Sequence, residues 1–329
     1  MKAYQRLLAG ILSLGIALGG SACGAARADH LSAGETPETA MVNLAADLKN
    51  YAREKRPGFL LVGNGAAGLL EVTRTNPEES VARLIDSLDG FLTESVFYVT
   101  DDEGKAEPQD EEMLAYLDAM LAKPCAAGKA VWTLDYLADA KLAARDRELG
   151  EARGYVSMTA ARTELDTLPD EVPDANIQDI TRVPEAKNFI FLLNPEKFSS
   201  RAAYLTALRQ TAADVLVLDL YYGETPLTTE EVESLQQKPQ GGRRLVLAYL
   251  SVGEAAEYRP YFDASWRKNP PLWLKAANPD WPGSYKVAYW SDPWRAILYG
   301  SPSAYLDQIL AAGFDGAFLD VMDAWQYFK

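Results

Sequence analysis

The sequence of 329 residues has little histidine and little cysteine, and these two shortages exclude several classes of catalytic site. The only histidine is His30, close to the amino terminus. A Ser-His-Asp triad, a Cys-His pair and a histidine-rich zinc site are therefore excluded from the predicted folded body. The two cysteines are Cys23, which we place in a leader, and Cys125, which is left without a disulfide partner. Proton chemistry then falls to carboxylate, tyrosine or lysine side chains.

The first 28 residues have the composition of a secretory signal. A basic start precedes an apolar run over 7–20 that is too short to remain as a membrane span, and small residues follow. Two cleavage sites compete: one resembles a lipoprotein site at Cys23, and the other follows the small-x-small rule and ends at Ala28. We expect an extracytoplasmic protein, secreted or periplasmic, that is either free or lipid-anchored at Cys23.

Basic residues are few relative to acidic ones, and the formal charge is −15. The leader over 1–28 carries three basic residues and no acid, so the processed chain is near −18. Nucleic acid and anionic membrane surfaces are therefore not expected as partners, and membrane contact would run only through a lipid anchor. A neutral or cationic ligand is compatible with this charge. We assign 29–37 to a linker and 38–329 to a single domain.

Eight short apolar runs, rich in branched and aromatic residues, predict buried strands at 59–62, 90–93, 130–134, 155–158, 189–193, 215–218, 245–252 and 316–319. Helical patterns separate them, including a capping box at 228–231 and a helix expected from Ser301 to Gly313. Continuous apolar strands that alternate with helices are typical of a parallel sheet covered on both faces. The predicted fold class is therefore α/β, a single-domain (β/α)8 TIM barrel.

The order of the elements is unusual, because the domain begins with a helix and ends with a strand. The first helix is capped at Thr36, and its apolar face includes Leu44. The last strand, around Phe318, has only a short tail after it. Since a barrel strand needs an outer helix, we predict that the first helix covers the last strand and closes the ring. The chain would then be a circular permutant.

Acidic side chains follow five of the eight predicted strands. Because the carboxyl ends of parallel strands share one face of a barrel, these groups are predicted to lie on one rim. The rim set is Asn64, Glu94, Asp135, Asp219, Glu254 and Asp320, with Glu257 and Asp323 slightly beyond. Any one acid is explained by the preference of Asp and Glu for loops and helix caps. As a set, they favour a functional site.

Carboxylates that converge without histidine favour glycoside hydrolysis. One acid stays protonated to assist the leaving oxygen while another acts as base or nucleophile, and crowded like charges separate their pKa values. We take Glu254 as the candidate acid and Asp219 or Asp320 as its partner, so that the catalytic set is Asp219, Glu254 and Asp320. This chemistry needs no cofactor. A Ca²⁺ site is the weaker alternative, since the sequence contains no calcium loop.

Aromatic residues are dense in the stretch 278–294, and sugar rings pack their C–H faces on aromatic rings. Trp281 and Tyr285 are predicted to contact sugar, whereas Trp294 could equally belong to a small core of the loop itself. Arg259 is close enough in sequence to Glu254 to hold it or to bind substrate. The predicted substrate-binding residues are Asn64, Glu94, Asp135, Tyr249, Glu257, Arg259, Trp281, Tyr285, Trp290 and Asp323.

The segment 63–68 matches G-x-G-x-x-G and raises the alternative of a dinucleotide-dependent oxidoreductase. That fold requires a full helix to begin at the glycine loop. Here Pro77 would end such a helix after about two turns. We therefore interpret the segment as a glycine-rich rim loop.

Several long blocks resemble one known family. LVLAYLSVGEAAEYRPYF, NPDWPGSYKVAYW and GFDGAFLDVMDAWQYF, together with DVLVLDLYYG, are similar to the signature blocks of extracellular glycosidases related to endo-α-1,4-polygalactosaminidase, glycoside hydrolase family 114. AMVNLAADLKNYAREKRPGFLLVGNG, LDGFLTESVFY and KAVWTLDY resemble blocks that follow the aspartate-rich signature in that family, whereas here they precede it. This order agrees with the permutation inferred above.

The resemblance implies a barrel hydrolase that acts on α-1,4-linked galactosamine or N-acetylgalactosamine polymers, with Asp219 at the position of the catalytic aspartate. One departure concerns the proton donor, because some members carry an acid directly after Trp-Pro-Gly and this chain has Ser284. The donor role is then either vacant or moved to Glu254. A non-catalytic carbohydrate-binding barrel lipoprotein is the first alternative function, and the oxidoreductase is the second.

Overall fold

The computed structural model describes residues 30–101 and 104–329. The predicted leader and its Cys23 lie outside the described residues. Among the described helices, none combines the length and the apolar character that a membrane crossing requires. The first described helix, α2 (Pro37–Lys55), begins one residue before the predicted start of the domain.

Eight parallel strands form the central sheet, and the prediction of a (β/α)8 barrel is confirmed. The strands are β1 (Leu60–Asn64), β2 (Gly90–Glu94), β5 (Ala130–Tyr136), β6 (Val156–Ala160), β7 (Ile190–Leu192), β8 (Val215–Leu218), β11 (Leu245–Ser251) and β15 (Gly316–Asp320). Their order in the sheet is β6-β5-β2-β1-β15-β11-β8-β7. Within the described part of the chain, β6 and β7 are not paired with each other, so the ring is nearly closed.

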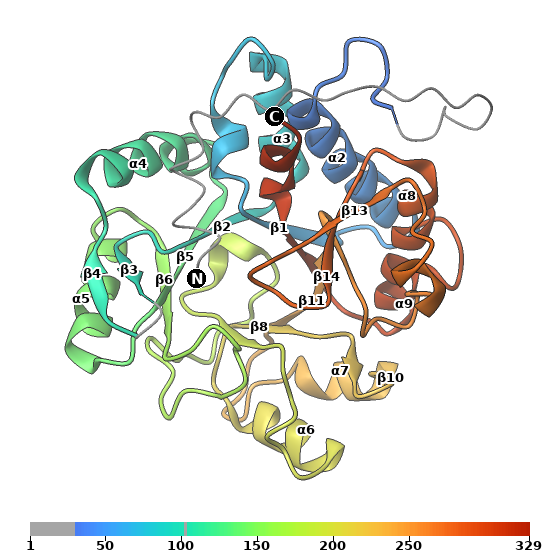
Figure 1. Ribbon diagram of the computed structural model, residues 1–329. Coiled ribbons are helices and arrows are strands. Elements are labelled where there is room, and N and C mark those ends of the chain that lie inside the picture. Colours follow the sequence, from blue (N-terminus) through green and yellow to red (C-terminus); the bar gives the residue numbers. More distant parts are fainter. Residues whose placement is uncertain (1–29, 102–103) are drawn as a thin grey trace.

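Helices surround the strands, as Figure 1 shows. Besides α2 they are α3 (Glu78–Ser87), α4 (Glu111–Ala126), α5 (Ala140–Glu151), α6 (Arg201–Gln210), α7 (Thr229–Leu235), α8 (Asp292–Leu298) and α9 (Tyr305–Ala311). The capping box predicted before α7 is present at Thr228 and Glu231. The expected start of α9 at Ser301 is wrong: the N–H of Ala304 bonds to the Ser301 carbonyl in a separate turn, and the helix begins at Tyr305.

Short antiparallel strands form small sheets that are separate from the barrel. One three-stranded sheet follows β11 and has the order β12 (Glu254–Ala256), β14 (Ser284–Val287), β13 (Leu274–Ala277). Two hairpins are formed by β3 (Tyr98–Thr100) with β4 (Ala106–Pro108) and by β9 (Tyr221–Tyr222) with β10 (Thr225–Pro226).

The apolar core has an inner and an outer layer because strand side chains alternate between the two faces of the sheet. On β15, Phe318 belongs to the cluster inside the barrel, whereas Ala317 and Leu319 belong to the cluster between strands and helices. Inside, Trp132 stacks on Phe189 with ring centroids 4.5 Å apart. The barrel interior is therefore packed with side chains.

The first and last strands of the barrel are neighbours. Strand β1 pairs with β15 from Leu60 opposite Gly316 to Gly63 opposite Leu319. Helix α2 lies over this seam: Leu44 shares the outer cluster with Leu319, and the Tyr51 hydroxyl donates to Asp307 of α9 over 2.7 Å. The helix-first, strand-last closure is confirmed. That this order is a permutation of the family order stays a prediction.

The glycine loop after β1 does not lead into a full helix. A short 3₁₀ turn at Ala67–Leu70 follows it, and α3 begins only at Glu78. The dinucleotide-binding fold needs a helix amino terminus at this point to hold the pyrophosphate. The oxidoreductase alternative therefore loses its structural basis.

Replacing Leu44 by Ala tests the seam between α2 and the barrel. Leu44 is fully buried, and truncation of a buried leucine costs about 2–5 kcal/mol of unfolding free energy. The exposed Asn50 of the same helix is the control, since Asn50→Ala should stay within about 0.5 kcal/mol. Urea denaturation measures both variants, and equal values would contradict the packing of α2 on the seam.

Candidate active site

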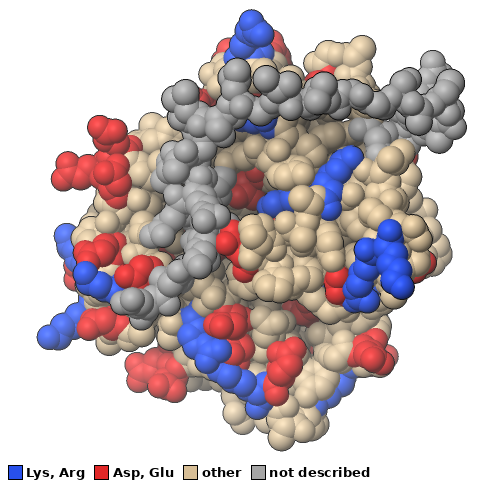
Figure 2. Space-filling view, in the orientation of Figure 1, with Lys and Arg blue, Asp and Glu red and all other residues tan. Residues whose placement is uncertain are grey.

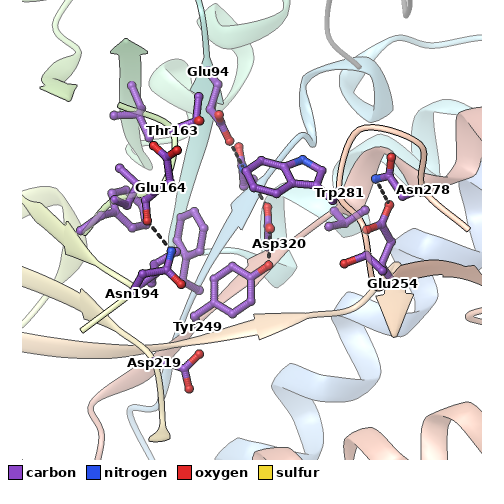
Figure 3. Close-up of a pocket in the computed structure, with 18 of the residues that line it drawn as sticks. Glu94, Thr163, Glu164, Asn194, Asp219, Tyr249, Glu254, Asn278, Trp281 and Asp320 are labelled. Atoms are coloured by element: carbon purple, nitrogen blue, oxygen red, sulfur yellow. Dashed lines mark hydrogen bonds between the residues drawn. The ribbon is translucent and has the colours of Figure 1, made fainter. Parts of the chain in front are cut away.

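A cavity of about 610 Å³ lies at the carboxyl ends of the barrel strands. Asp219 follows β8, Glu254 begins β12 after β11, and Asp320 ends β15, and all three side chains line the cavity. Figure 3 shows these three residues around one space. The predicted convergence of acids from distant parts of the chain is thus present, while their catalytic roles stay predictions.

Figure 2 shows the molecule in the orientation of Figure 1, with both acidic and basic side chains on that face. The cavity itself also mixes charges, because Arg259 and Lys286 line it together with the acids. Within the described ranges, no group of three or more histidine, cysteine or acidic side chains is placed to hold a metal ion.

A chain of hydrogen bonds connects two rim carboxylates through an amide. The Asn64 Nδ2 donates to Glu94 Oε1 over 2.7 Å and to Asp320 Oδ1 over 2.8 Å. At the two ends of this chain, the Tyr136 hydroxyl donates to Glu94 and the Tyr249 hydroxyl donates to Asp320, each over 2.6 Å. Burial, reinforced by the negative charge of Asp320, raises the pKa of Glu94. Asn64 therefore bridges two neighbouring carboxyl groups, and their proximity disfavours the charged form of Glu94.

Asp219 is paired with a buried arginine. Arg259 Nη1 lies 2.9 Å from Asp219 Oδ1, and Nη2 lies 2.7 Å from Oδ2. The amide of Tyr221 donates to Oδ1 over 2.8 Å. From the sequence, Arg259 is expected to hold Glu254 or to bind substrate. The first of these roles is wrong, because the segment after β12 turns Arg259 toward Asp219 at the end of β8. These three donors fix the orientation of the Asp219 carboxylate.

Glu254 is also held as an acceptor. Its Oε1 receives Asn278 Nδ2 over 2.8 Å and the Lys286 ammonium. Lys286 comes from β14, which pairs with β12 and places Lys286 directly opposite Glu254. These contacts hold Glu254 in place as an acceptor, which disfavours its predicted role as the proton donor.

Asp323 lies three residues after Asp320 and lines the same cavity. Burial raises its pKa to about 7; the ammonium of Lys286 opposes this rise, and the charges of Asp320 and Glu254 add to it. A Cβ at Gly65 would lie 3.2 Å from the Asp323 side chain, so the glycine-rich rim loop runs directly against Asp323. The interpretation of that loop as part of the rim is consistent with this contact.

Four predicted substrate contacts do not line the cavity: Asp135, Glu257, Tyr285 and Trp290. Asp135 is fully buried, and its carboxylate accepts the backbone N–H groups of Val96, Phe97 and Tyr98. It anchors the segment between β2 and β3. The prediction failed because Asp135 is not the last residue of β5, and Tyr136, the next residue, is the one that reaches the cavity.

The other three side chains point elsewhere because of strand alternation and loop packing. On β14, Ser284 and Lys286 line the cavity, so the intervening Tyr285 faces away, stacks on Phe262 with centroids 5.8 Å apart, and donates to Glu257. Glu257 is also paired with Arg267, over 2.6 Å. Trp290 packs edge-on against Phe328, with centroids 4.6 Å apart, and lines a separate polar cavity of about 290 Å³.

The remaining predicted contacts do line the cavity: Asn64, Glu94, Tyr249, Arg259, Trp281 and Asp323. Sequence reasoning missed several others, namely Tyr136, Glu164, Asn194, Tyr258, Asn278 and Lys286. Tyr136 and Lys286 carry a usable signal, since each directly follows a predicted contact, Asp135 or Tyr285, and therefore lies on the other face of its strand. Glu164 lies in the long irregular segment between β6 and β7, where no periodic pattern indicates which side chains face inward.

Replacing Asp135 tests its assignment as an anchor. Asp135→Ala leaves three buried N–H groups without an acceptor, each worth about 1–3 kcal/mol, so we expect a loss of at least about 3 kcal/mol of unfolding free energy. Asp135→Asn keeps one oxygen acceptor and should lose less. The matched control is Asp139→Asn at the N-cap of α5, which should be near neutral because Asn caps as well as Asp. Chemical denaturation that ranked Asp135→Ala with the control would contradict the assignment.

Four of the cavity acids lie in a part of the sequence that is similar to known proteins. Residues 175–329 match the model of the glycoside-hydrolase family GH114. An uncharacterized protein of Methanocaldococcus jannaschii is 35% identical over 146 residues, 41% of each chain, and one of Deinococcus radiodurans is 40% identical over 123 residues, 37% of each chain. A third, from Thermotoga maritima, is 41% identical over 81 residues, 25% of this chain and 24% of its own. The aligned region thus spans about two fifths or less of each relative. The carboxyl-terminal half of this chain, with Asp219, Glu254, Asp320 and Asp323, is similar to family GH114.

Proposed function

We propose that this protein is a glycoside hydrolase that cleaves a polysaccharide with carboxylate groups of the rim cavity. The main observation is that Asp219, Glu254, Asp320 and Asp323 line one cavity and lie within residues 175–329, the region that matches a glycoside-hydrolase family. Glycosidases of the common mechanisms need two carboxyl groups, one on either side of the scissile bond. The cavity provides several, and they differ in their hydrogen-bond partners.

Asp219 is the proposed nucleophile or base. Its two oxygens are oriented by Arg259, so the carboxylate is fixed in direction before the substrate binds. A fixed negative charge also stabilises the positive charge that develops at the anomeric carbon in the transition state. Trp281 lines the cavity with 46% of its surface exposed, which leaves an aromatic face for a sugar ring.

The proposed substrate is an α-1,4-linked polymer of galactosamine or N-acetylgalactosamine. The resemblance of the signature blocks supports this choice. The cavity supports it as well, because its lining contains more acidic side chains than basic ones, which are Arg259 and Lys286, and an acidic lining suits an ammonium-bearing sugar. The leader composition supports an extracytoplasmic location, where such polymers are found, and Cys23 is the proposed site of lipid attachment if the chain is anchored.

One observation favours a second function, a carbohydrate-binding barrel without catalysis. Ser284, which stands where some members of the resembling family have an acid, lines the cavity. If no other group supplies the proton, the cavity would bind sugar and leave the bond intact. Binding of a polymer without release of shorter products would support this alternative.

The processed protein should release oligosaccharides from one member of a panel of amino-sugar polymers, detected by mass spectrometry. Asp219→Asn should lower kcat/KM by about 10²–10⁴-fold, the usual size of one carboxylate contribution, while the variant still binds the polymer. Asp139→Asn, at an exposed helix cap, is the control and should retain wild-type activity. A wild-type protein that binds polymer without cleavage would replace the hydrolase with the binding function, and equal activity of Asp219→Asn and wild type would remove Asp219 from the mechanism.

A further inference from the structure

We propose that Asp323 is the group that delivers the proton to the leaving glycosidic oxygen. This inference rests on the proposed function, since it assigns a role within the same cavity. It also departs from the sequence-based choice of Glu254. Three independent features of the structure support it: the hydrogen bonds of the competing acids, the backbone that positions Asp323, and the charges that surround its carboxyl group.

The other carboxyl groups that could act as the proton donor already accept hydrogen bonds from neighbouring side chains. Arg259 binds both oxygens of Asp219. Asp320 receives Asn64 on one oxygen and the Tyr249 hydroxyl on the other. Both oxygens of each group already act as hydrogen-bond acceptors, so neither group is free to turn toward a bound substrate as a donor.

Glu254 accepts Asn278 and Lys286 on the same oxygen, Oε1, which ties the carboxyl group to β14 and its neighbouring loop. Asp323 differs from all of these groups: among the described residues, no side chain forms an ion pair or a hydrogen bond with its carboxyl group. A carboxyl group that lines a cavity without such a partner is free to hold a proton and to turn it toward a bound substrate.

The backbone places Asp323 at a strained turn. Val321, between Asp320 and the 3₁₀ segment Met322–Phe328, adopts the left-handed conformation with φ 61°. For a β-branched residue this conformation is a genuine outlier, and strain of this kind costs on the order of 1–3 kcal/mol. It persists here because Gly253 packs on this turn: a Cβ at Gly253 would come within 2.3 Å of the Val321 carbonyl oxygen.

The consequence of this turn is that the chain reverses at the end of β15, so that both Asp320 and Asp323 reach the cavity. An unstrained continuation of the strand would carry Asp323 away from the rim. Backbone strain that brings a titratable side chain into a cavity is typical of a functional position.

The charges around Asp323 come from three elements. Asp320 lies on β15, Glu254 on β12 and Lys286 on β14. Burial raises the pKa of Asp323 to about 7; Lys286 works against this, and Asp320 and Glu254 increase it. The group therefore stays protonated in slightly acidic solution and loses its proton as the pH rises through about 7. The same shift means that its contribution to stability is complete below the unfolded pKa and is lost as the pH rises through about 7.

The chemical step balances with water as the co-reactant. The bond between the anomeric carbon and the glycosidic oxygen breaks, its electron pair stays on that oxygen, and the oxygen takes the proton of Asp323. The anomeric carbon gains a new bond either from an oxygen of Asp219 or from a water molecule that gives a proton to Asp219. When Asp219 is the nucleophile, water later replaces it with the Asp323 carboxylate as the base, which restores both groups.

The test compares two substrates that differ in their need for a proton. The first is the polymer that the wild type cleaves, and the second is a nitrophenyl glycoside of the same sugar, whose leaving group departs without protonation. For Asp323→Asn we expect kcat/KM on the polymer to fall by about 10²–10⁴-fold and kcat/KM on the nitrophenyl glycoside to fall by less than about tenfold. The control is Asp139→Asn, at an exposed helix cap outside the cavity, which should retain activity on both.

A second measurement needs no variant. For the wild type, kcat/KM on the polymer should decline above a pH of about 7, the pKa of Asp323, whereas the nitrophenyl glycoside should show no such decline. In Asp323→Asn, residual polymer cleavage should lose this alkaline limb. The melting temperature of each variant establishes that it is folded.

Three outcomes would overturn the assignment, and they can be told apart. If the wild type cleaves neither substrate, the proposed function fails and the assignment falls with it. If the wild type is active and Asp323→Asn matches it on the polymer, the function stands and Asp323 is not the donor. If Glu254→Gln, rather than Asp323→Asn, shows the loss confined to the polymer, the donor is Glu254.

Discussion

The pairing of the first barrel strand with the last is the constraint on which the site depends. Asn64 is the final residue of β1, and Asp320 is the final residue of β15. Because these parallel strands are neighbours, the Asn64 amide reaches Asp320 across the seam. A chain that failed to close there would separate the glycine-rich rim loop from Asp323. Helix α2 protects the seam from outside, so fold stability and site geometry depend on the same contact.

The second constraint on the cavity is the repulsion between acidic side chains that line the same space. Each ionised acid has its own donor: Arg259 for Asp219, Lys286 for Glu254, and Asn64 with Tyr249 for Asp320. These partners come from different elements, so each carboxylate is oriented by its own partner. What remains is Asp323, a carboxyl group surrounded by charge but not paired with it. Such a separation of environments is how a site obtains both an acid and a base from one residue type.

The sequence predicts the barrel and its rim because strands and their ends are local patterns. All eight strands lie where apolar runs were found, and Asp219 and Asp320 line one cavity as parallel topology requires, whereas Glu254 reaches it from β12 of the antiparallel sheet. It does not predict side-chain partners, which depend on how loops return to the rim. Arg259 is five residues from Glu254 in sequence yet pairs with Asp219. Tyr285 was chosen for its ring, although alternation on β14 gives the cavity Lys286 instead.

The central proposal is that the rim cavity holds the sugar with its scissile bond between Asp219 and Asp323. A crystal structure of the Asp219→Asn variant with an uncleaved oligosaccharide tests this most directly. We expect a sugar ring against Trp281, the anomeric carbon facing residue 219, and the glycosidic oxygen within hydrogen-bond distance of the Asp323 carboxyl group. An oligosaccharide bound outside this cavity, or one whose glycosidic oxygens all lie beyond the reach of Asp323, would contradict it.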